Sequence, residues 1–420
     1  MIYDVAVIGA GPAGLLAAKT ASELGMKTVL VEKRKDVSKI TRACSMQFIL
    51  DDGYENEYVQ LQDDKILFTR NGFSVDYNGK THDLTHKYYI SPGGSSIHFA
   101  NSDGSPFAVK FEKGVLLEQL RQACEKSGAE LREHTVCYDA YDGSDGTTVL
   151  LSEGGTKSTI KARKLIAADG ANSRMTEALG MNGQRKLFTV ALCIIFLVEG
   201  IKDYDPHAWK RYMGKAFSPN AGVTIAPSFY DGVADVIIGA RTAMPPDRMY
   251  HEITTNYKLA PLFQNARVID KFGCSLKAFT SLKVPHKGNV LAVGDAAAYV
   301  EVEVQGALMC GFRAAHAVKR ELEGKNGYND YSAWWGDSFE FNSDEYLRVA
   351  QGYALSPTYS DAELDYLFAL TEDQVLEGTY SQYKSPKLMW DSILRHKQRI
   401  KKDRPEIYAK IKKNRELILQ

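Results

Sequence analysis

The chain has 420 residues, with 52 basic and 52 acidic side chains, so its formal net charge is zero. Hydrophobic residues make up 44% and charged residues 25%, a composition ordinary for a globular protein that excludes disorder as the dominant state. Nucleic-acid-binding proteins normally show a basic excess, so nucleic acid is not expected as a partner. The six scattered cysteines form no CxxC pair, which predicts free thiols and no metal site.

The apolar stretches predict no membrane span. Asp4 interrupts the first of them, so a secretory leader is not expected. The longest uninterrupted run, residues 190–198, is too short to cross a bilayer as a helix. We therefore expect a cytoplasmic protein that is at most peripheral to a membrane.

The first 32 residues predict a strand–helix–strand unit. Residues 3–8 are apolar like a buried parallel strand, residues 15–24 form an Ala-rich helix, and residues 27–32 form the second strand. The glycine turn GAGPAG joins the first strand to the helix, where phosphates meet the backbone amides of a helix N-terminus. Glu32 ends the second strand, where a carboxylate can accept hydrogen bonds from a ribose. The expected dinucleotide contacts in this unit are Gly9, Gly11, Pro12, Ala13, Gly14, Glu32 and Lys33.

Two further motifs follow predicted strands. Asp169 and Gly170 come after the strand 164–168, and Gly294 and Asp295 come after the strand 289–293. An Asp at the carboxyl end of a strand suits a ribityl hydroxyl, and a following helix favours a negatively charged flavin ring. Each motif alone is equally compatible with a turn or a helix N-cap.

The order of these three motifs resembles the flavoprotein superfamily of para-hydroxybenzoate hydroxylase and geranylgeranyl reductases, up to about residue 320. The resemblance implies FAD as the cofactor. It also implies an α/β fold with a Rossmann-like FAD-binding domain interleaved with an antiparallel β-sheet substrate domain, plus a helical C-terminal region. The expected division is 1–70, 105–185 and 280–325 for the FAD-binding domain, 71–104 and 186–279 for the substrate domain, and 326–420 for the helical region.

The segment Ile40–Cys44 most resembles the geranylgeranyl reductase family. The resemblance implies that Arg42 and Ala43 contact FAD and that Cys44 lies near the flavin as a candidate catalytic residue, although Cys44 also suits a small buried apolar position. Lys113 stands where the family usually has an arginine, and Val136 is a further expected cofactor contact; Gln119 and Gln122 are weaker candidates. The family's Tyr-x-Trp-x-Phe-Pro stretch falls on residues 222–227, where only Pro227 remains.

The loop after the Gly294–Asp295 motif is unusually short and brings two acids near the expected flavin. Glu301 and Glu303 are candidate catalytic general acids, provided that desolvation raises their pKa values. The alternative is that they are exposed polar positions on a strand that alternates with valines.

The basic stretch near residues 395–415 is either a solvated helix face or a docking surface for an anionic membrane or an acidic redox partner.

These features predict an FAD-dependent reductase or dehydrogenase that acts on a C=C or related bond of an apolar or aromatic small-molecule substrate. Because the chain has no second GxGxxG motif, NAD(P)H without its own domain and a ferredoxin-like protein are both candidate electron donors. One alternative is a flavin-dependent aromatic monooxygenase, and the other is a non-catalytic FAD-binding partner protein.

Overall fold

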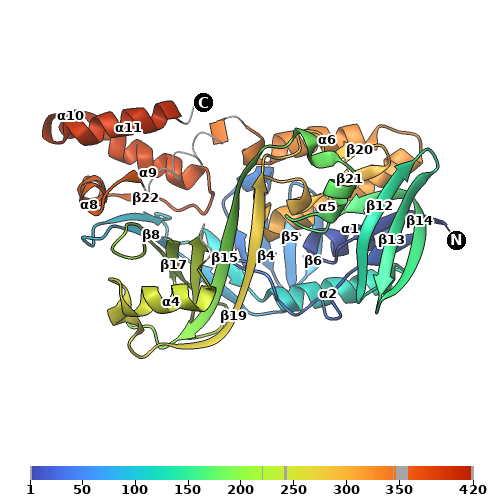
Figure 1. Ribbon diagram of the computed structural model, residues 1–420, viewed down its shortest axis with the longest axis horizontal. Coiled ribbons are helices and arrows are strands. Elements are labelled where there is room, and N and C mark those ends of the chain that lie inside the picture. The colour runs from blue at the N-terminus through green and yellow to red at the C-terminus, as the bar shows by residue number, and fades with distance from the viewer. Residues whose placement is uncertain (1, 220, 241–243, 344, 347–357, 418–420) are drawn as a thin grey trace.

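The computed structural model describes residues 2–219, 221–240, 244–343, 345–346 and 358–417. Its first sheet, on the right of Figure 1, has the strand order β11-β2-β1-β14-β13-β12, with β21 pairing with β14 and β20 with β21. The strands are β1 (Ile2–Ile8), β2 (Thr28–Val31), β11 (Glu130–Arg132), β12 (Thr135–Gly143), β13 (Gly146–Glu153), β14 (Thr156–Ala167), β20 (His286–Lys287) and β21 (Val290–Ala292).

The centre of this sheet is parallel. β1 pairs in parallel with β2 and β14, and β14 pairs in parallel with β21. β2 and β21 are buried along their whole length, which fits a parallel sheet covered by helices. Helix α1 (Pro12–Glu23) packs against α2 (Lys113–Lys126) and α5 (Glu303–Leu322). The predicted Rossmann-like unit is therefore confirmed.

The second sheet has the strand order β19-β15-β18-β17-β16-β8-β9-β22. It is mostly antiparallel, but β8 pairs with β16 and β9 with β22 in parallel, so the sheet is mixed. β15 and β19 pair over nearly their whole length and cross the middle of the molecule (Figure 1). The strands are β8 (His86–Ile90), β9 (Ser96–Ala100), β15 (Leu187–Glu199), β16 (Ala208–Tyr212), β17 (Ala221–Pro227), β18 (Val233–Ala240), β19 (Arg267–Phe279) and β22 (Val375–Glu377).

Two small sheets and the remaining helices complete the described fold. One small sheet contains β3 (Gln47–Ile49), β10 (Ala108–Phe111) and β7 (Thr81–Leu84), and the other contains β4 (Val59–Gln62), β5 (Lys65–Phe68) and β6 (Phe73–Asp76). The other helices are α3 (Arg174–Ala178), α4 (Pro246–Thr255), α6 (Gly327–Ser338), α8 (Asp361–Ala369), α9 (Lys384–Arg395), α10 (Lys397–Asp403) and α11 (Pro405–Leu417).

The C-terminal region is not purely helical, because β22 adds a strand to the edge of the second sheet. Apolar side chains of α8, α9, α10 and α11 share one core with Ile97 and Phe99 of β9. The domain division predicted from the sequence stays a prediction.

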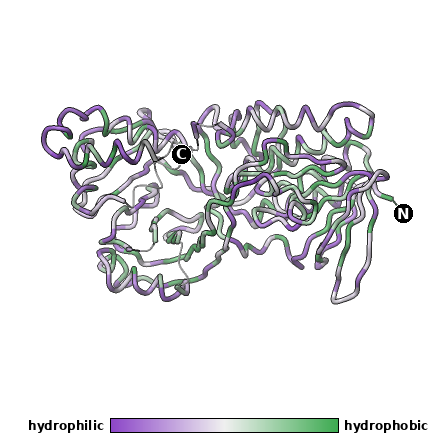
Figure 2. Tube along the Cα trace, turned by 45° about the horizontal axis from the view of Figure 1, so that its top comes forward, coloured by the Kyte–Doolittle hydropathy of each residue, from purple (hydrophilic) through white to green (hydrophobic). Residues whose placement is uncertain are grey.

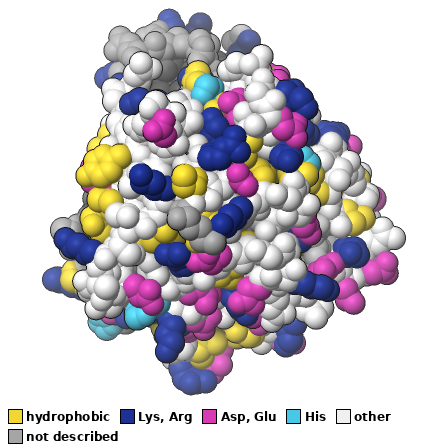
Figure 3. All heavy atoms as spheres, turned by 90° about the vertical axis from the view of Figure 1, so that its right-hand side faces the viewer, with side chains coloured by type: hydrophobic (Ala, Val, Ile, Leu, Met, Phe, Trp, Pro, Cys, Tyr) yellow, Lys and Arg dark blue, Asp and Glu magenta, His cyan; other side chains and the backbone are white. Residues whose placement is uncertain are grey.

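Hydrophobic stretches run through the interior of the molecule, whereas the segments near the C-terminus show both polar and apolar positions (Figure 2). None of the described helices combines the length and apolar character that crossing a bilayer requires. Basic and acidic side chains are intermingled on the face that Figure 3 shows, so this face carries no large patch of one sign.

Candidate cofactor and active site

The glycine turn between β1 and α1 leaves open space in front of the helix. A Cβ at Gly9, whose φ is +102°, would lie 2.5 Å from the carbonyl oxygen of Ala168, and one at Gly14 would lie 1.8 Å from that of Gly9. A Cβ at Gly11 would instead meet no described atom within 4 Å. Gly11 is the N-cap of α1 and supplies no side-chain cap to the helix. Backbone amides facing open space at a helix N-terminus fit a pyrophosphate.

Glu32 lies beside this turn and is held by Arg34. One carboxylate oxygen accepts from the Ala10 amide at 2.7 Å, and the other accepts from Arg34 Nε at 2.9 Å. Burial alone would raise the pKa of Glu32, but the Arg34 guanidinium and the amide bonds lower it below its ordinary value. Lys33 is exposed, and Arg34 is the basic residue that contacts Glu32, the side chain expected to bind the ribose. Residues i and i+2 of an extended chain share a side, and this spacing could have indicated Arg34.

Two other predicted cofactor contacts lie near opposite ends of the site. Val136 is half-buried on β12, next to Thr135, whose amide donates to the Glu32 carbonyl at 2.8 Å. Lys113 is the first residue of α2, and its positive charge acts on the carboxyl group of Glu301.

The two weaker candidates on α2 make other contacts. Gln119 accepts from the Asn78 amide at 3.2 Å, and Gln122 donates to Glu118 at 2.8 Å.

The predicted Asp169–Gly170 motif forms a tight turn. Asp169 accepts from the Ser173 hydroxyl at 2.5 Å and from the Arg174 amide at 2.7 Å, so its carboxylate holds the turn itself. Gly170 has a φ of +84°, and a Cβ there would lie 3.1 Å from a guanidinium nitrogen of Arg42. The turn therefore brings Arg42 close to the backbone of this motif.

Arg42 also meets the third motif. Its Nη1 lies 3.3 Å from Oδ2 of Asp295, and Oδ1 of Asp295 accepts from the Val302 amide at 3.0 Å. Gly294, at a φ of +62°, packs near the methyl group of Ala13. Asp295 thus both holds Arg42 and fixes the turn that precedes α5. Ala43, next in the chain, is half-buried.

The two acids after this motif are Glu301, which lies in the loop before α5, and Glu303, which is the first residue of α5. Val300 and Glu303 have φ values of 65° and 56°, in the left-handed region that non-glycine residues seldom adopt. Glu303 begins α5, so the alternating strand of the alternative is wrong, although Glu301 is exposed as that alternative expected and Glu303 is half-buried. Loss of solvent around each carboxyl group raises the pKa of both acids; Asp295 raises that of Glu301 further, while nearby Arg42 lowers it.

Glu303 also lies near Cys44. The negative charge of Glu301 and then the Cys44 thiol raise the pKa of Glu303 further, after burial. Cys44 is half-buried, and its sulfur accepts from the Met46 amide at 3.5 Å. The structure therefore gathers Cys44, Glu301 and Glu303, which lie far apart in the sequence.

The C-terminal region contributes two residues that sequence reasoning missed. Gln382 donates to Glu301 at 3.3 Å. Tyr380 is buried, and burial and the charge of Glu303 raise its pKa. No local pattern links these residues to the acids, because the contact depends on how the last part of the chain folds back.

The βαβ unit, the open glycine turn and the convergence of Arg42 with Gly170 and Asp295 define a dinucleotide-binding flavoprotein. The model of the FAD binding domain family matches residues 2–303, and the chain belongs to this family. It is an FAD-dependent oxidoreductase, as the sequence predicts.

Named relatives carry the comparison further. The digeranylgeranylglycerophospholipid reductase of Methanosarcina acetivorans is 28% identical over 301 residues, which cover 70% of this chain and 69% of the relative. The structure of a geranylgeranyl bacteriochlorophyll reductase-like protein from Thermoplasma acidophilum matches with a TM-score of 0.73 at 18% identity, covering 98% and 99% of the two chains. A p-nitrophenol 4-monooxygenase from Pseudomonas putida matches with a TM-score of 0.63 at 15% identity, covering 94% and 97%. The predicted resemblance to geranylgeranyl reductases is confirmed, and the solved structures show the shared fold.

Proposed function

We propose that this protein reduces carbon–carbon double bonds of an apolar, prenyl-type substrate. The named relatives support the substrate class. The observation that carries the reaction type is the acid pair Glu301 and Glu303 beside the Arg42–Asp295 contact. FAD, when bound, supplies the hydride chemistry.

In this proposal Glu303 holds the proton that the second carbon of the double bond needs. Burial and the neighbouring negative charges raise its pKa, which favours the protonated form that a general acid requires. Arg42 and Asp295 orient the cofactor end of the site, and the glycine turn with Glu32 holds the nucleotide end. Cys44 lies next to Glu303, where it would contact the substrate or the flavin.

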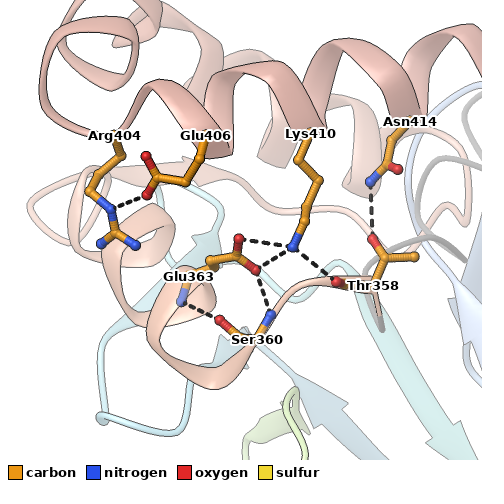
Figure 4. A network of polar contacts seen from close by, with 7 residues as sticks. All are labelled: Thr358, Ser360, Glu363, Arg404, Glu406, Lys410 and Asn414. Atoms are coloured by element: carbon orange, nitrogen blue, oxygen red, sulfur yellow. Dashed lines mark hydrogen bonds and ion pairs between the residues drawn. The ribbon is translucent and has the colours of Figure 1, made fainter.

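The exposed part of the basic C-terminal stretch is a candidate membrane contact. We propose that the exposed lysines Lys401, Lys402, Lys412 and Lys413 form the membrane-facing part of the basic stretch. Arg404 and Lys410 are already paired with Glu406 and Glu363 (Figure 4). Side-chain placement at Arg415, also in the predicted stretch, lies outside the described residues.

The test is anaerobic turnover of a digeranylgeranyl lipid in deuterated water, with dithionite, NAD(P)H or a reduced ferredoxin as donor. Each reduced bond should gain two hydrogen atoms, and the carbon that takes up the proton should carry deuterium, so the product is heavier than the one formed in ordinary water. Glu303→Gln should lose this activity, whereas Glu323→Gln, an exposed change just after the same helix, should keep it. Incorporation of labelled oxygen under aerobic conditions would instead identify a monooxygenase.

A further inference from the structure

Two cysteines that are far apart in the sequence are direct neighbours in the second sheet. Cys193 on β15 is the register partner of Cys274 on β19, and both are half-buried free thiols. The adjacent pairs are in regular register, because the two irregularities of this ladder lie further away, at 187/189 and 197/198. Side chains that are directly opposite in an antiparallel pair point to the same face. Their Cα atoms are about 4.5–5.5 Å apart in such pairs, within the range that a disulfide bridges.

This cysteine pair lies at the cofactor site. The Arg42 guanidinium, which contacts Asp295, also lies close enough to the sulfur of Cys274 for the two groups to interact. Asn172 donates to the Ser275 carbonyl at 2.7 Å and accepts from the Lys277 amide at 3.0 Å. Two hydrogen bonds of Asn172 therefore hold β19 against the Asp169–Gly170 turn, next to Cys274.

Cys193 shares these surroundings. Burial, followed by Cys274 and Glu301, raises the pKa of its thiol to about 12, so Glu301 lies near this thiol as well. The pair is thus next to the same Arg42–Asp295 contact that marks the expected flavin position.

We propose that Cys193 and Cys274 form a redox-active dithiol that exchanges an electron pair with FAD. Closure breaks two S–H bonds and forms one S–S bond, and the two electrons and two protons released pass to FAD. A dithiol reductant restores the pair by thiol–disulfide exchange. The protein would then hold a second two-electron store and accept electrons from a thiol donor.

The proposal rests on FAD binding and not on the identity of the substrate. Its test therefore uses the holoenzyme without substrate, so that its failure and the failure of the proposed reductase activity are distinguishable.

The oxidised holoenzyme is titrated anaerobically with dithionite while FAD absorbance is followed. Wild type should take up four electrons per FAD, and Cys193→Ser and Cys274→Ser should each take up two. Cys124→Ala, a buried cysteine on α2, should behave like wild type. Uptake of two electrons by the oxidised wild type would overturn the proposal.

A second measurement needs no variant. The wild type is equilibrated in glutathione buffers of different ratio, alkylated, digested and mapped by mass spectrometry. The expected product is a Cys193–Cys274 cross-linked peptide pair that disappears in reducing buffer. Full alkylation of both cysteines at every ratio, or a cross-link through Cys44, would refute the assignment.

Discussion

Gly11 and Gly14 stand three residues apart at the start of α1, but the space around them differs. A side chain at Gly11 enters open space, whereas one at Gly14 collides with the Gly9 carbonyl. We predict that Gly11→Val folds but purifies without FAD, because the valine fills the space that the pyrophosphate needs. Flavin absorbance and the melting temperature of the apoprotein test this. Gly14→Ala should instead lower the melting temperature of the apoprotein, and stoichiometric FAD in Gly11→Val would show that the cofactor binds elsewhere.

The acid pair predicts a pH dependence at the same scale. Glu303 donates its proton only while it is protonated, so the rate should fall as pH rises through its raised pKa. Glu301→Gln removes a neighbouring negative charge that raises the pKa of Glu303, so the fall should move to lower pH. The measurement is the pH profile of single-turnover reduction for wild type and Glu301→Gln. A shift to higher pH, or no shift, would argue against Glu303 as the acid.

Residue roles were predictable where a local backbone constraint fixes them. The glycines of the first turn follow from the spacing of one motif and Asp295 from the order of three, whereas Arg42 was expected from the resemblance of the segment Ile40–Cys44; their contacts with FAD stay predictions. The contact of Arg34 with Glu32 was not predicted, and the expected contact of Lys33 with the cofactor stays a prediction. Tyr380 and Gln382 could not be predicted, since they meet Glu301 and Glu303 only through long-range folding.

At the scale of elements, α11 is fixed to α8 by a small network (Figure 4). Ser360 and Glu363 form a capping box at the start of α8, and Lys410 donates to both Glu363 oxygens at 2.8 and 2.6 Å. The carbonyl of Thr358 accepts from the same ammonium group at 3.2 Å. One side chain of α11 thus satisfies a carboxylate and a carbonyl of the preceding segment.

Lys410→Met should destabilise the protein by about 1 kcal/mol at pH 7, because the ion pair is partly exposed. Burial alone would raise the pKa of Glu363, but Lys410 and the cap lower it below its ordinary value. The stabilisation is therefore present above about pH 4.3, the ordinary glutamate value, and is lost as pH falls through the lowered pKa. Melting temperatures at pH 7 and pH 3.5 test this, with the exposed Lys412→Met as the control. An equal difference between variant and wild type at both pH values would contradict the account.

Elements were predictable from periodicity, but one boundary was missed for a physical reason. Valines at 300, 302 and 304 alternate with acids and favour a strand, yet α5 begins at Glu303. Asp295 accepts from the Val302 amide and bends the chain before the helix, so a tertiary contact overrides the local preference. The parallel pairs of the second sheet were likewise hidden, because β8 and β16 meet only after a long connection.

At the scale of the whole molecule, a buried ion pair joins a small sheet to the second sheet. Lys110 on β10 contacts Asp235 on β18 at 2.5 Å, with side-chain exposures of 1% and 4%. Lys110 also donates to the Ser45 carbonyl, next to Cys44. The pair therefore links the segment that carries Arg42 and Cys44 to the sheet that carries the cysteine pair.

Lys110→Met should lower the free energy of unfolding by about 3–5 kcal/mol, because it leaves the Asp235 carboxylate buried without its partner. The double change Lys110→Met with Asp235→Leu should recover most of this loss, since no buried charge remains. Thermal unfolding of the apoprotein and FAD content measure both effects. A double variant as unstable as the single one would mean that lost packing, and not an unpaired charge, causes the damage.

The pairing of β22 with β9 also has a consequence during synthesis. β9 is complete once residue 100 has been made, but the strand that covers its edge ends at residue 377. While the ribosome makes the intervening chain, the outer backbone groups of β9 lack this strand, and uncovered strand edges recruit other chains. A nascent chain that stalls before residue 375 would thus expose an unpaired strand edge that can pair with other chains. A chaperone that covers β9 during this interval would prevent such pairing.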